Sequence, residues 1–258
     1  HEAIKIDGDN GIEKLVTLAK QDKVKFSDAL PFIKEQYYVP KPCIPLDKKL
    51  SKLKYIPIDC LKEVLNNKFL KEKLEDLNNL GTYEVRTLAS IRGLEQSEPY
   101  RVESFYFNAD CGLYIIVGSK TKEELTYIEE LLESLSYSGI GGKRSLGMGR
   151  FSIEKSKLPS ILETGLQLKT SKYLLLSVAL PQKDELSSVL NGKEGYQLLK
   201  RSGFIFSDSC DDRRKRDLYV FSAGSYFSKQ FTGDVYNVSN GDTHPVYRYA
   251  KPMFLGVS

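Results

Sequence analysis

Two alternating runs of apolar and polar residues, separated by a turn-like segment, constrain the fold of this chain more than any other feature. Residues Tyr83 to Ile91 alternate in polarity, residues Gly93 to Pro99 are turn-like, and residues Tyr100 to Phe107 alternate again. Alternation with a period of two places every second side chain on the same face of a strand. We therefore predict a long antiparallel β-hairpin over residues 82–107.

Helical signals alternate with further strand signals along the rest of the chain. Helices are expected over residues 10–19, 27–33, 59–77, 121–139 and 184–200. Capping boxes of Asn10 with Glu13 and of Thr121 with Glu124 mark two of the helix starts. Strands are expected over residues 113–117, 173–180, 204–206, 218–221, 235–238 and 246–249. Because each half mixes helices with strands that hairpins join, the α+β class with antiparallel sheets is favoured over a doubly wound parallel sheet.

The length of 258 residues favours two modest domains, and 41% hydrophobic with 28% charged residues excludes a disordered chain. A weakly patterned stretch that holds Pro159 is the predicted linker, over residues 157–169. Beyond it the succession of strands and helices starts again. We therefore predict an N-terminal domain over residues 1–156 and a C-terminal domain over residues 170–258.

Several functional classes are excluded by what the sequence lacks. The two histidines, His1 and His244, are too few for a histidine-rich metal site, and neither a metal nor another cofactor is predicted. No apolar run reaches the roughly 18 residues that a membrane span needs, so no membrane partner is expected. The four cysteines form no CxxC pair and no secretory signal is present, which is typical of a reducing, cytoplasmic location.

The segment from Gly139 to Phe151 is the strongest functional signal, because it holds five of the chain's 19 glycines within 11 residues. Between positions 141 and 157, five basic residues against Glu154 give a net charge of +4, equal to that of the whole chain. Glycines permit positive φ angles and close approach of the backbone to an anion. The predicted anion-binding residues are Gly139, Gly141, Gly142, Lys143, Arg144, Ser145, Gly147, Gly149 and Arg150.

This segment does not match the common nucleotide-binding motifs. A P-loop requires other residues where Tyr137 and Arg144 stand, and a dinucleotide motif requires a glycine at Arg144 and a preceding strand, where a helix is expected. A polyanion backbone remains, and 16 tyrosines with 12 phenylalanines offer stacking surfaces that favour single-stranded nucleic acid. A glycine-rich turn that only packs closely is the alternative for the motif taken alone.

Other charged groups admit both a functional and a structural interpretation. The run Asp211–Asp217 is more typical of a solvated loop than of a paired-carboxylate catalytic site, although its arginines can contact RNA. His244 has no partner histidine or cysteine, so a hydrogen-bonding role is favoured over that of a general base, and His1 has no other site residue nearby in the sequence, which disfavours a role in RNA cleavage. Further RNA contacts are predicted at Lys41, Arg213, Arg214, Arg216, Arg248 and Lys251.

The segment Gly139–Phe151 resembles the glycine-rich loop of the RAMP superfamily of CRISPR RNA-binding proteins. Five further segments narrow this resemblance: Tyr38–Pro42, Asn108–Tyr114, Lys200–Phe204, Asp217–Ser225 and His244–Gly256. Taken in this order, they resemble the family of fourth subunits of type III-A Csm effector complexes over nearly the whole chain. That family normally has a further strand and a helix entry before the position of His1, so the N-terminal domain is expected to lack its first strand.

The resemblance implies two ferredoxin-like (RRM-type) domains and a protruding hairpin, here called the thumb, for which residues 82–107 are the candidate. It also implies a non-catalytic RNA-binding scaffold that caps the interference complex and holds the 5′ handle of the guide RNA. The implied partners are the guide RNA (crRNA), the large polymerase-cyclase subunit, the backbone RAMP subunit and, indirectly, target RNA. The thumb residues expected to contact RNA are Arg86, Ser90, Ile91, Arg92 and Leu94.

A function of a different class also fits the sequence. A metal-independent endoribonuclease that processes guide RNA is likewise built from ferredoxin-like domains. No Gly-x-Ser-x-Gly elbow is present. The leading interpretation is therefore the RNA-binding scaffold, with the endoribonuclease as the alternative.

Overall fold

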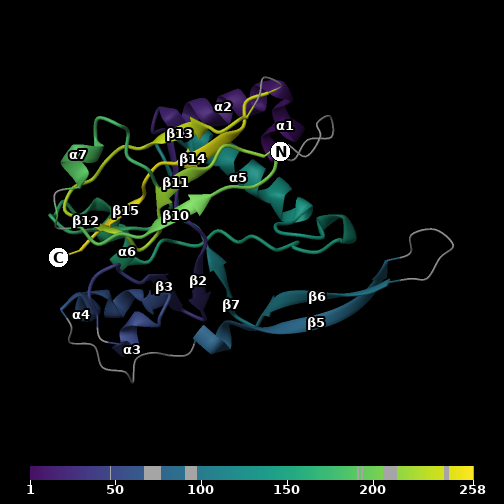
Figure 1. The fold of residues 1–258 in the computed structure, drawn as a ribbon, viewed down its shortest axis with the longest axis horizontal. Coiled ribbons are helices and arrows are strands. Elements are labelled where there is room, and N and C mark those ends of the chain that lie inside the picture. Colours follow the sequence, from purple (N-terminus) through teal and green to yellow (C-terminus); the bar gives the residue numbers. More distant parts are fainter. Residues whose placement is uncertain are drawn as a thin grey trace. The chain divides into compact units, whose positions relative to one another are not determined.

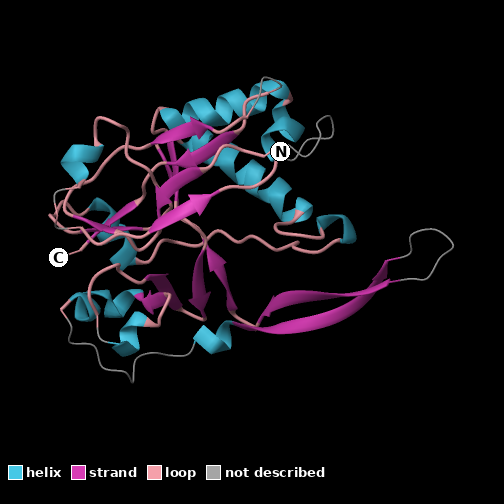
Figure 2. Cartoon of the chain, viewed as in Figure 1, coloured by secondary structure: helices cyan, strands magenta, loops and turns pink. Residues whose placement is uncertain are grey.

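In the computed structural model, the chain combines short helices with antiparallel strands (Figures 1 and 2). The structure describes residues 1–46, 48–66, 77–90, 98–190, 192, 194–205, 214–240 and 244–257. All of the strand pairs in that part of the chain are antiparallel. The predicted α+β class with antiparallel sheets is confirmed.

The chain forms two compact units. The first unit comprises His1–Asp28, Pro42–Pro45 and Ile115–Ser258, and the second comprises Ala29–Lys41 and Leu46–Tyr114. The stretch predicted as a linker lies within the first unit and contains the helix α6 (Ser160–Gln167). The division into domains at residues 157–169 stays a prediction.

The first unit contains most of the helices and four small sheets. Its helical elements are α1 (Glu2–Asp7), α2 (Asp9–Lys20), α5 (Lys122–Ser138), η4 (Arg144–Leu146), α6 and α7 (Leu186–Val189). Its strands are β1 (Val24–Phe26), β8 (Val117–Ser119), β9 (Tyr173–Leu175), β10 (Leu198–Arg201), β11 (Leu218–Phe221), β12 (Tyr226–Phe227), β13 (Asp234–Asn237), β14 (Tyr247–Ala250) and β15 (Phe254–Gly256). They pair as β1-β8, β10-β11, β13-β14 and β12-β9-β15.

The second unit holds a four-stranded sheet and a long two-stranded ribbon. Its strands are β2 (Leu30–Ile33), β3 (Gln36–Pro40), β4 (Tyr55–Pro57), β5 (Gly81–Ser90), β6 (Glu98–Phe107) and β7 (Cys111–Tyr114). The sheet has the order β4-β3-β2-β7, and β5 pairs with β6. The helical elements are α3 (Lys48–Ser51), η1 (Ile58–Cys60), α4 (Leu61–Leu65) and η3 (Leu77–Leu80).

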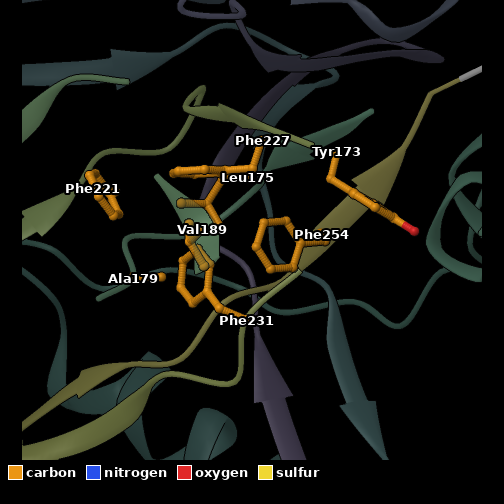
Figure 3. Packing of buried hydrophobic residues seen from close by; sticks show 8 residues of the cluster. All are labelled: Tyr173, Leu175, Ala179, Val189, Phe221, Phe227, Phe231 and Phe254. Carbon is orange, nitrogen blue, oxygen red and sulfur yellow. The ribbon is translucent and has the colours of Figure 1, made fainter. Parts of the chain in front are cut away.

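Among the described residues of the first unit, two clusters of buried side chains stand out. One is largely aromatic (Figure 3) and consists of Tyr173, Leu175, Ala179, Val189, Phe221, Phe227, Phe231 and Phe254. The Phe231 ring meets the rings of Phe227 and Phe254 edge to face at centroid distances of 5.5 and 5.1 Å, a favourable aromatic geometry. The other cluster packs α1, α2 and α5 against β1 and β13 through Ala3, Ala19, Val24, Tyr127, Ile128, Leu131 and Val235.

The hairpin predicted over residues 82–107 is present. The two strands of this ribbon pair from Gly81 with Phe107 to Ser90 with Glu98, and Figure 1 shows it extending beyond the four-stranded sheet of its own unit. Most of its side chains are exposed, among them Tyr83 at 69% and Val85 at 59%. The alternation that predicted the strands is therefore not accompanied by burial of one face.

Two helix predictions are wrong. Residues 27–33 contain β2, which pairs with both β3 and β7 and is buried at Leu30 and Ile33. That pairing with a distant segment outweighs the local helical pattern. Within the described part of residues 184–200, the predicted helix is limited to the four residues of α7, because Leu190 leaves the helical conformation and residues from Leu198 onward form β10.

Other boundaries differ more modestly. The capping box of Thr121 and Glu124 is confirmed, whereas α2 begins at Asp9 and has no side-chain cap, so the box at Asn10 is wrong. The predicted strand over 113–117 is divided between β7 and β8. Strand β11 matches its prediction, and β13 and β14 lie one residue from theirs. Residues 67–76 of the predicted helix at 59–77 lie outside the described residues.

Candidate nucleic-acid interface

The helix α5 places the glycine-rich segment at its C-terminal end. Its start is fixed by the Thr121 hydroxyl, which accepts a hydrogen bond from the Glu124 amide at 3.3 Å, while the Glu124 carboxylate accepts one from the Thr121 amide at 3.0 Å. Its end is fixed by Gly139, whose amide donates to the Leu135 carbonyl at 2.8 Å and whose φ of +78° turns the chain away. The segment therefore leaves a firmly terminated helix.

The last turn of α5 is also held by α1. The Glu2 carboxylate accepts hydrogen bonds from Ser134 and from Ser138, the latter at 3.1 Å, and Lys5 donates to the Ser138 hydroxyl at 2.7 Å. Burial by itself raises the pKa of the Glu2 carboxyl, but these hydrogen bonds and Lys5 outweigh it and lower the pKa below its ordinary value. Because Ser138 precedes Gly139, this network fixes the point from which the loop departs.

Two of the five glycines are required by the loop's own packing. The Ile140 amide donates to the Gly149 carbonyl at 2.9 Å and closes the base of the loop. A Cβ atom at Gly149 would lie 1.9 Å from the Ile140 carbonyl oxygen, and one at Gly139 would lie 2.8 Å from that of Met148. Close packing within the loop is therefore sufficient to explain why these two positions are glycines.

The other three glycines face open space. No heavy atom lies within 4 Å of where a Cβ would stand at Gly141, Gly142 or Gly147. Gly141 and Gly147 have φ angles of +90° and +77°, which favour glycine, whereas Gly142 has no such requirement. The backbone at Gly142 is thus accessible to a ligand, and neither close packing nor a positive φ requires a glycine there.

The cations predicted for the loop lie within it or directly after its base. Lys143, Ser145 and Arg150 are exposed, and Arg144 is half-buried at the start of η4. Tyr137 lies in the last turn of α5 and is 71% exposed, but it was not predicted as an RNA contact. The sequence feature that could have identified it is an aromatic residue two positions before Gly139 that does not belong to the apolar face of the predicted helix.

The further predicted RNA contacts lie in different environments. Lys251 is 1% exposed, and its ammonium lies 3.2 Å from the Asp22 carboxylate, so in this structure it stabilises the core and is inaccessible to RNA. The Lys41 ammonium donates to the Ser51 carbonyl at 2.9 Å. Arg214, Arg216 and Arg248 lie together on another part of the first unit, and Arg213 lies outside the described residues.

Of the predicted thumb residues, Arg86 is fully described. Its guanidinium lies 3.4 Å from the Glu84 carboxylate and 5.6 Å from the centre of the Tyr106 ring, and its side chain stays 60% exposed. Ser90 ends β5, and its side chain lies outside the described part. Ile91, Arg92 and Leu94 also lie outside the described residues.

Two kinds of site are not found in the described part of the chain. There, no group of three or more His, Cys, Asp and Glu side chains is placed to hold a metal ion. No helix among the same residues is long and apolar enough to cross a membrane.

Comparisons with known proteins place the chain in a family. A family model described as the RAMP superfamily matches residues 18–152, and one described as the CRISPR Csm4 C-terminal domain matches residues 168–257. The Mycobacterium tuberculosis protein named CRISPR system Cms protein Csm4 is 35% identical over 268 residues, which cover 99% of this chain and 86% of that protein. The chain belongs to the Csm4 family. The family resemblance seen in the sequence is therefore confirmed.

Other relatives of this Csm4-family chain agree. The Streptococcus thermophilus protein of the same name is 35% identical over 265 residues, covering 95% of this chain and 84% of that protein. A chain in the crystal structure of a Csm3-Csm4 subcomplex in the type III-A interference complex matches with a TM-score of 0.69, 21% identity and coverage of 100% of this chain and 90% of that chain. A chain in the crystal structure of a Csm1-Csm4 cassette in complex with cA4 matches with a TM-score of 0.60 and 19% identity, covering 100% of this chain and 87% of that chain. These structures show a shared RAMP fold.

Proposed function

We propose that this chain is a non-catalytic RNA-binding scaffold subunit of a type III-A CRISPR interference complex, which caps the complex and holds the 5′ handle of the guide RNA. The observation that carries the proposal is the outer half of the glycine-rich loop. There, backbone open at Gly142 is followed by the exposed cation Lys143, and the exposed Arg150 follows Gly149 at the base of the loop. Open backbone and cations suit a phosphate chain, which is bound mainly through its charge.

The proposed partners follow from the family. Structures similar to this chain contain Csm4 in complex with Csm3 and with Csm1. These complexes support a backbone RAMP subunit and the large polymerase-cyclase subunit as neighbours of this chain. The two family models leave residues 153–167 between them, which supports two ferredoxin-like domains separated near the stretch 157–169. The projecting β5–β6 ribbon supports the assignment of residues 82–107 as the thumb.

The loop proposal predicts a specific change in salt dependence. Replacing Lys143, Arg144 and Arg150 together with alanine should weaken binding of handle-containing RNA and lower the log–log salt slope by about two units, at about 0.7 per single-strand phosphate. Fluorescence anisotropy titrations over a range of salt concentrations measure this slope. The matched control replaces the exposed Lys169, Lys183 and Lys229, which removes the same charge elsewhere.

Glycine substitutions complete this test. Gly142→Ala and the larger Gly142→Val leave the loop unstrained, so both should fold normally while binding RNA more weakly, valine more so. Gly149→Ala should instead disturb the loop itself, since its Cβ would meet the Ile140 carbonyl. A folded triple variant whose salt slope equals that of the control triple contradicts the loop assignment.

The endoribonuclease alternative is separated from the scaffold by the fate of the RNA. Incubating the purified chain with handle-containing RNA should shift the RNA intact on a native gel. Defined new ends on a denaturing gel, formed without added metal, would instead establish the nuclease.

A further inference from the structure

A second group of cations lies in the C-terminal half of the chain, on segments that the backbone joins side by side. Strand β10 pairs with β11, and β13 pairs with β14. Between them, the Lys215 amide donates to the Gly203 carbonyl at 2.8 Å and the Arg216 amide to that of Val238 at 2.9 Å. The cations gathered here, called the basic surface below, are Lys200, Arg201, Arg214, Lys215, Arg216 and Arg248.

Carboxylates compensate this charge poorly within the described residues. Asp217 lies 2.8 Å from the Lys200 ammonium and also interacts electrostatically with Arg214, and Asp28 interacts with Arg201, so among these described residues two carboxylates face six cations. The guanidinium groups of Arg216 and Arg248 are instead positioned by backbone carbonyls, of Asn237 at 2.7 Å and of Ser202 at 2.9 Å. A carbonyl fixes the position of a cation without neutralising its charge.

The like charges act on one another. Burial and the neighbouring Arg201 lower the pKa of Arg248. Burial and Arg248 in turn lower the pKa of Lys215. Bringing these three cations together is unfavourable in the free chain, and a bound polyanion would relieve that repulsion.

Exposed aromatic rings lie among the cations. Tyr219, 55% exposed, stands opposite Lys200 in the β10–β11 pair, with the ammonium 5.9 Å from the ring centre. Phe204, 63% exposed, forms a β-bridge with Arg214. Interleaved cations and exposed rings are the combination that binds single-stranded nucleic acid through its phosphates and bases together.

We infer that the basic surface binds a second stretch of single-stranded RNA, with phosphates at Arg201, Lys215 and Arg248 and a base stacked on Phe204. This inference rests on the proposed function and extends it, because the glycine-rich loop then holds only part of the bound RNA. An acidic protein surface would match the charge but would leave the exposed Phe204 ring without a role.

The test is an anisotropy titration of the full chain with a fluorescent single-stranded RNA of about 16 nucleotides, starting at low salt. Replacing Arg201, Lys215 and Arg248 with alanine should lower the salt slope by about two units. Phe204→Ala should weaken binding about tenfold without changing the slope, because stacking releases no counterions. The control triple at Lys169, Lys183 and Lys229 should keep the slope of the unmodified chain.

Arg248 also holds the Ser202 carbonyl, so a second variant replaces Arg201 and Lys215 alone and should lower the slope by about 1.4. If both surface variants match the control while the loop variant at Lys143, Arg144 and Arg150 binds poorly, this inference fails and the proposed function stands. If instead the surface variants bind RNA poorly and the loop variant matches the control, the RNA site on the basic surface is supported and the loop assignment is contradicted. Failure of the unmodified chain to bind at low salt contradicts both, and variants that bind RNA normally but lose a partner subunit overturn the inference in favour of a protein contact.

Discussion

At Glu185 a single carboxylate accepts hydrogen bonds from three backbone amides. These come from Gln182 at 2.8 Å, Thr232 at 2.6 Å and Gly233 at 3.2 Å, so one side chain joins two segments far apart in sequence. Burial by itself raises the pKa of the Glu185 carboxyl, but the hydrogen bonds outweigh it and lower the pKa below its ordinary value. The ionised form therefore stabilises the fold.

Glu185→Gln should lower the free energy of unfolding by about 1 kcal/mol at neutral pH, since the charge-assisted hydrogen bonds weaken at a partly solvated site. The folded pKa is depressed, so this stabilisation is present above the ordinary value of 4.5 and is lost as the pH falls through the folded pKa. Urea titrations of both proteins across this range measure the difference. A gap that stays constant as the pH falls would show that the carboxylate charge is not responsible.

Lys251 marks a limit of sequence interpretation at the residue scale. A lysine near the end of a basic, aromatic-rich segment is a reasonable RNA contact, yet its partner Asp22 lies in the turn after α2. That ion pair exists only once the two ends of the chain are packed together. By contrast, the open position at Gly142 and the packed ones at Gly139 and Gly149 are within one loop, and the sequence located that loop from composition alone.

At the scale of elements, local signals predicted well what local interactions determine. The capping box before α5 and the alternation of β5 and β6 are contained in short stretches, and both elements are present. Strand β2 was predicted as a helix because it depends on pairing with β7, and the helix at α7 was predicted too long because it already ends at Val189. The basic surface escaped notice as a unit because β10, β11 and β14 bring its cations together from separate segments.

The β5–β6 ribbon makes the thumb assignment testable. Because Ser90 pairs with Glu98, residues 91–97 can be replaced by a two-residue Asn-Gly turn that keeps the register. We expect this shortened variant to fold and to bind the handle nearly as well as the unmodified chain. In the assembled complex it should disturb guide–target pairing beside the handle, since inserting a side chain between bases requires the removed tip.

Chemical probing of the guide–target duplex measures that pairing. The matched control is Arg101→Ala, which keeps the tip and removes an exposed cation from the ribbon that is not among the predicted RNA contacts. If the nucleotide at the junction remains unpaired in the shortened variant, the thumb assignment is wrong.

At the scale of the whole molecule, exposed apolar side chains predict how the isolated chain behaves. Tyr83 and Val85 on the ribbon are 69% and 59% exposed, and Ile140 and Leu146 within the glycine-rich loop are each 60% exposed. Apolar side chains gathered in this way mark interaction surfaces and become aggregation sites when the partner is missing. A two-stranded ribbon is also only marginally stable by itself.

We therefore expect the isolated chain to self-associate and to bind handle RNA weakly, and co-expression with its complex partners to correct both. Light scattering after size-exclusion chromatography measures the first effect, and anisotropy at physiological salt the second. Replacing Tyr83 and Val85 with serine and threonine should reduce self-association of the isolated chain, because less apolar surface is exposed, and should weaken assembly with the partner that covers the ribbon. An isolated chain that is monodisperse and binds handle RNA at nanomolar concentrations would show that its surfaces need no partner for recognition.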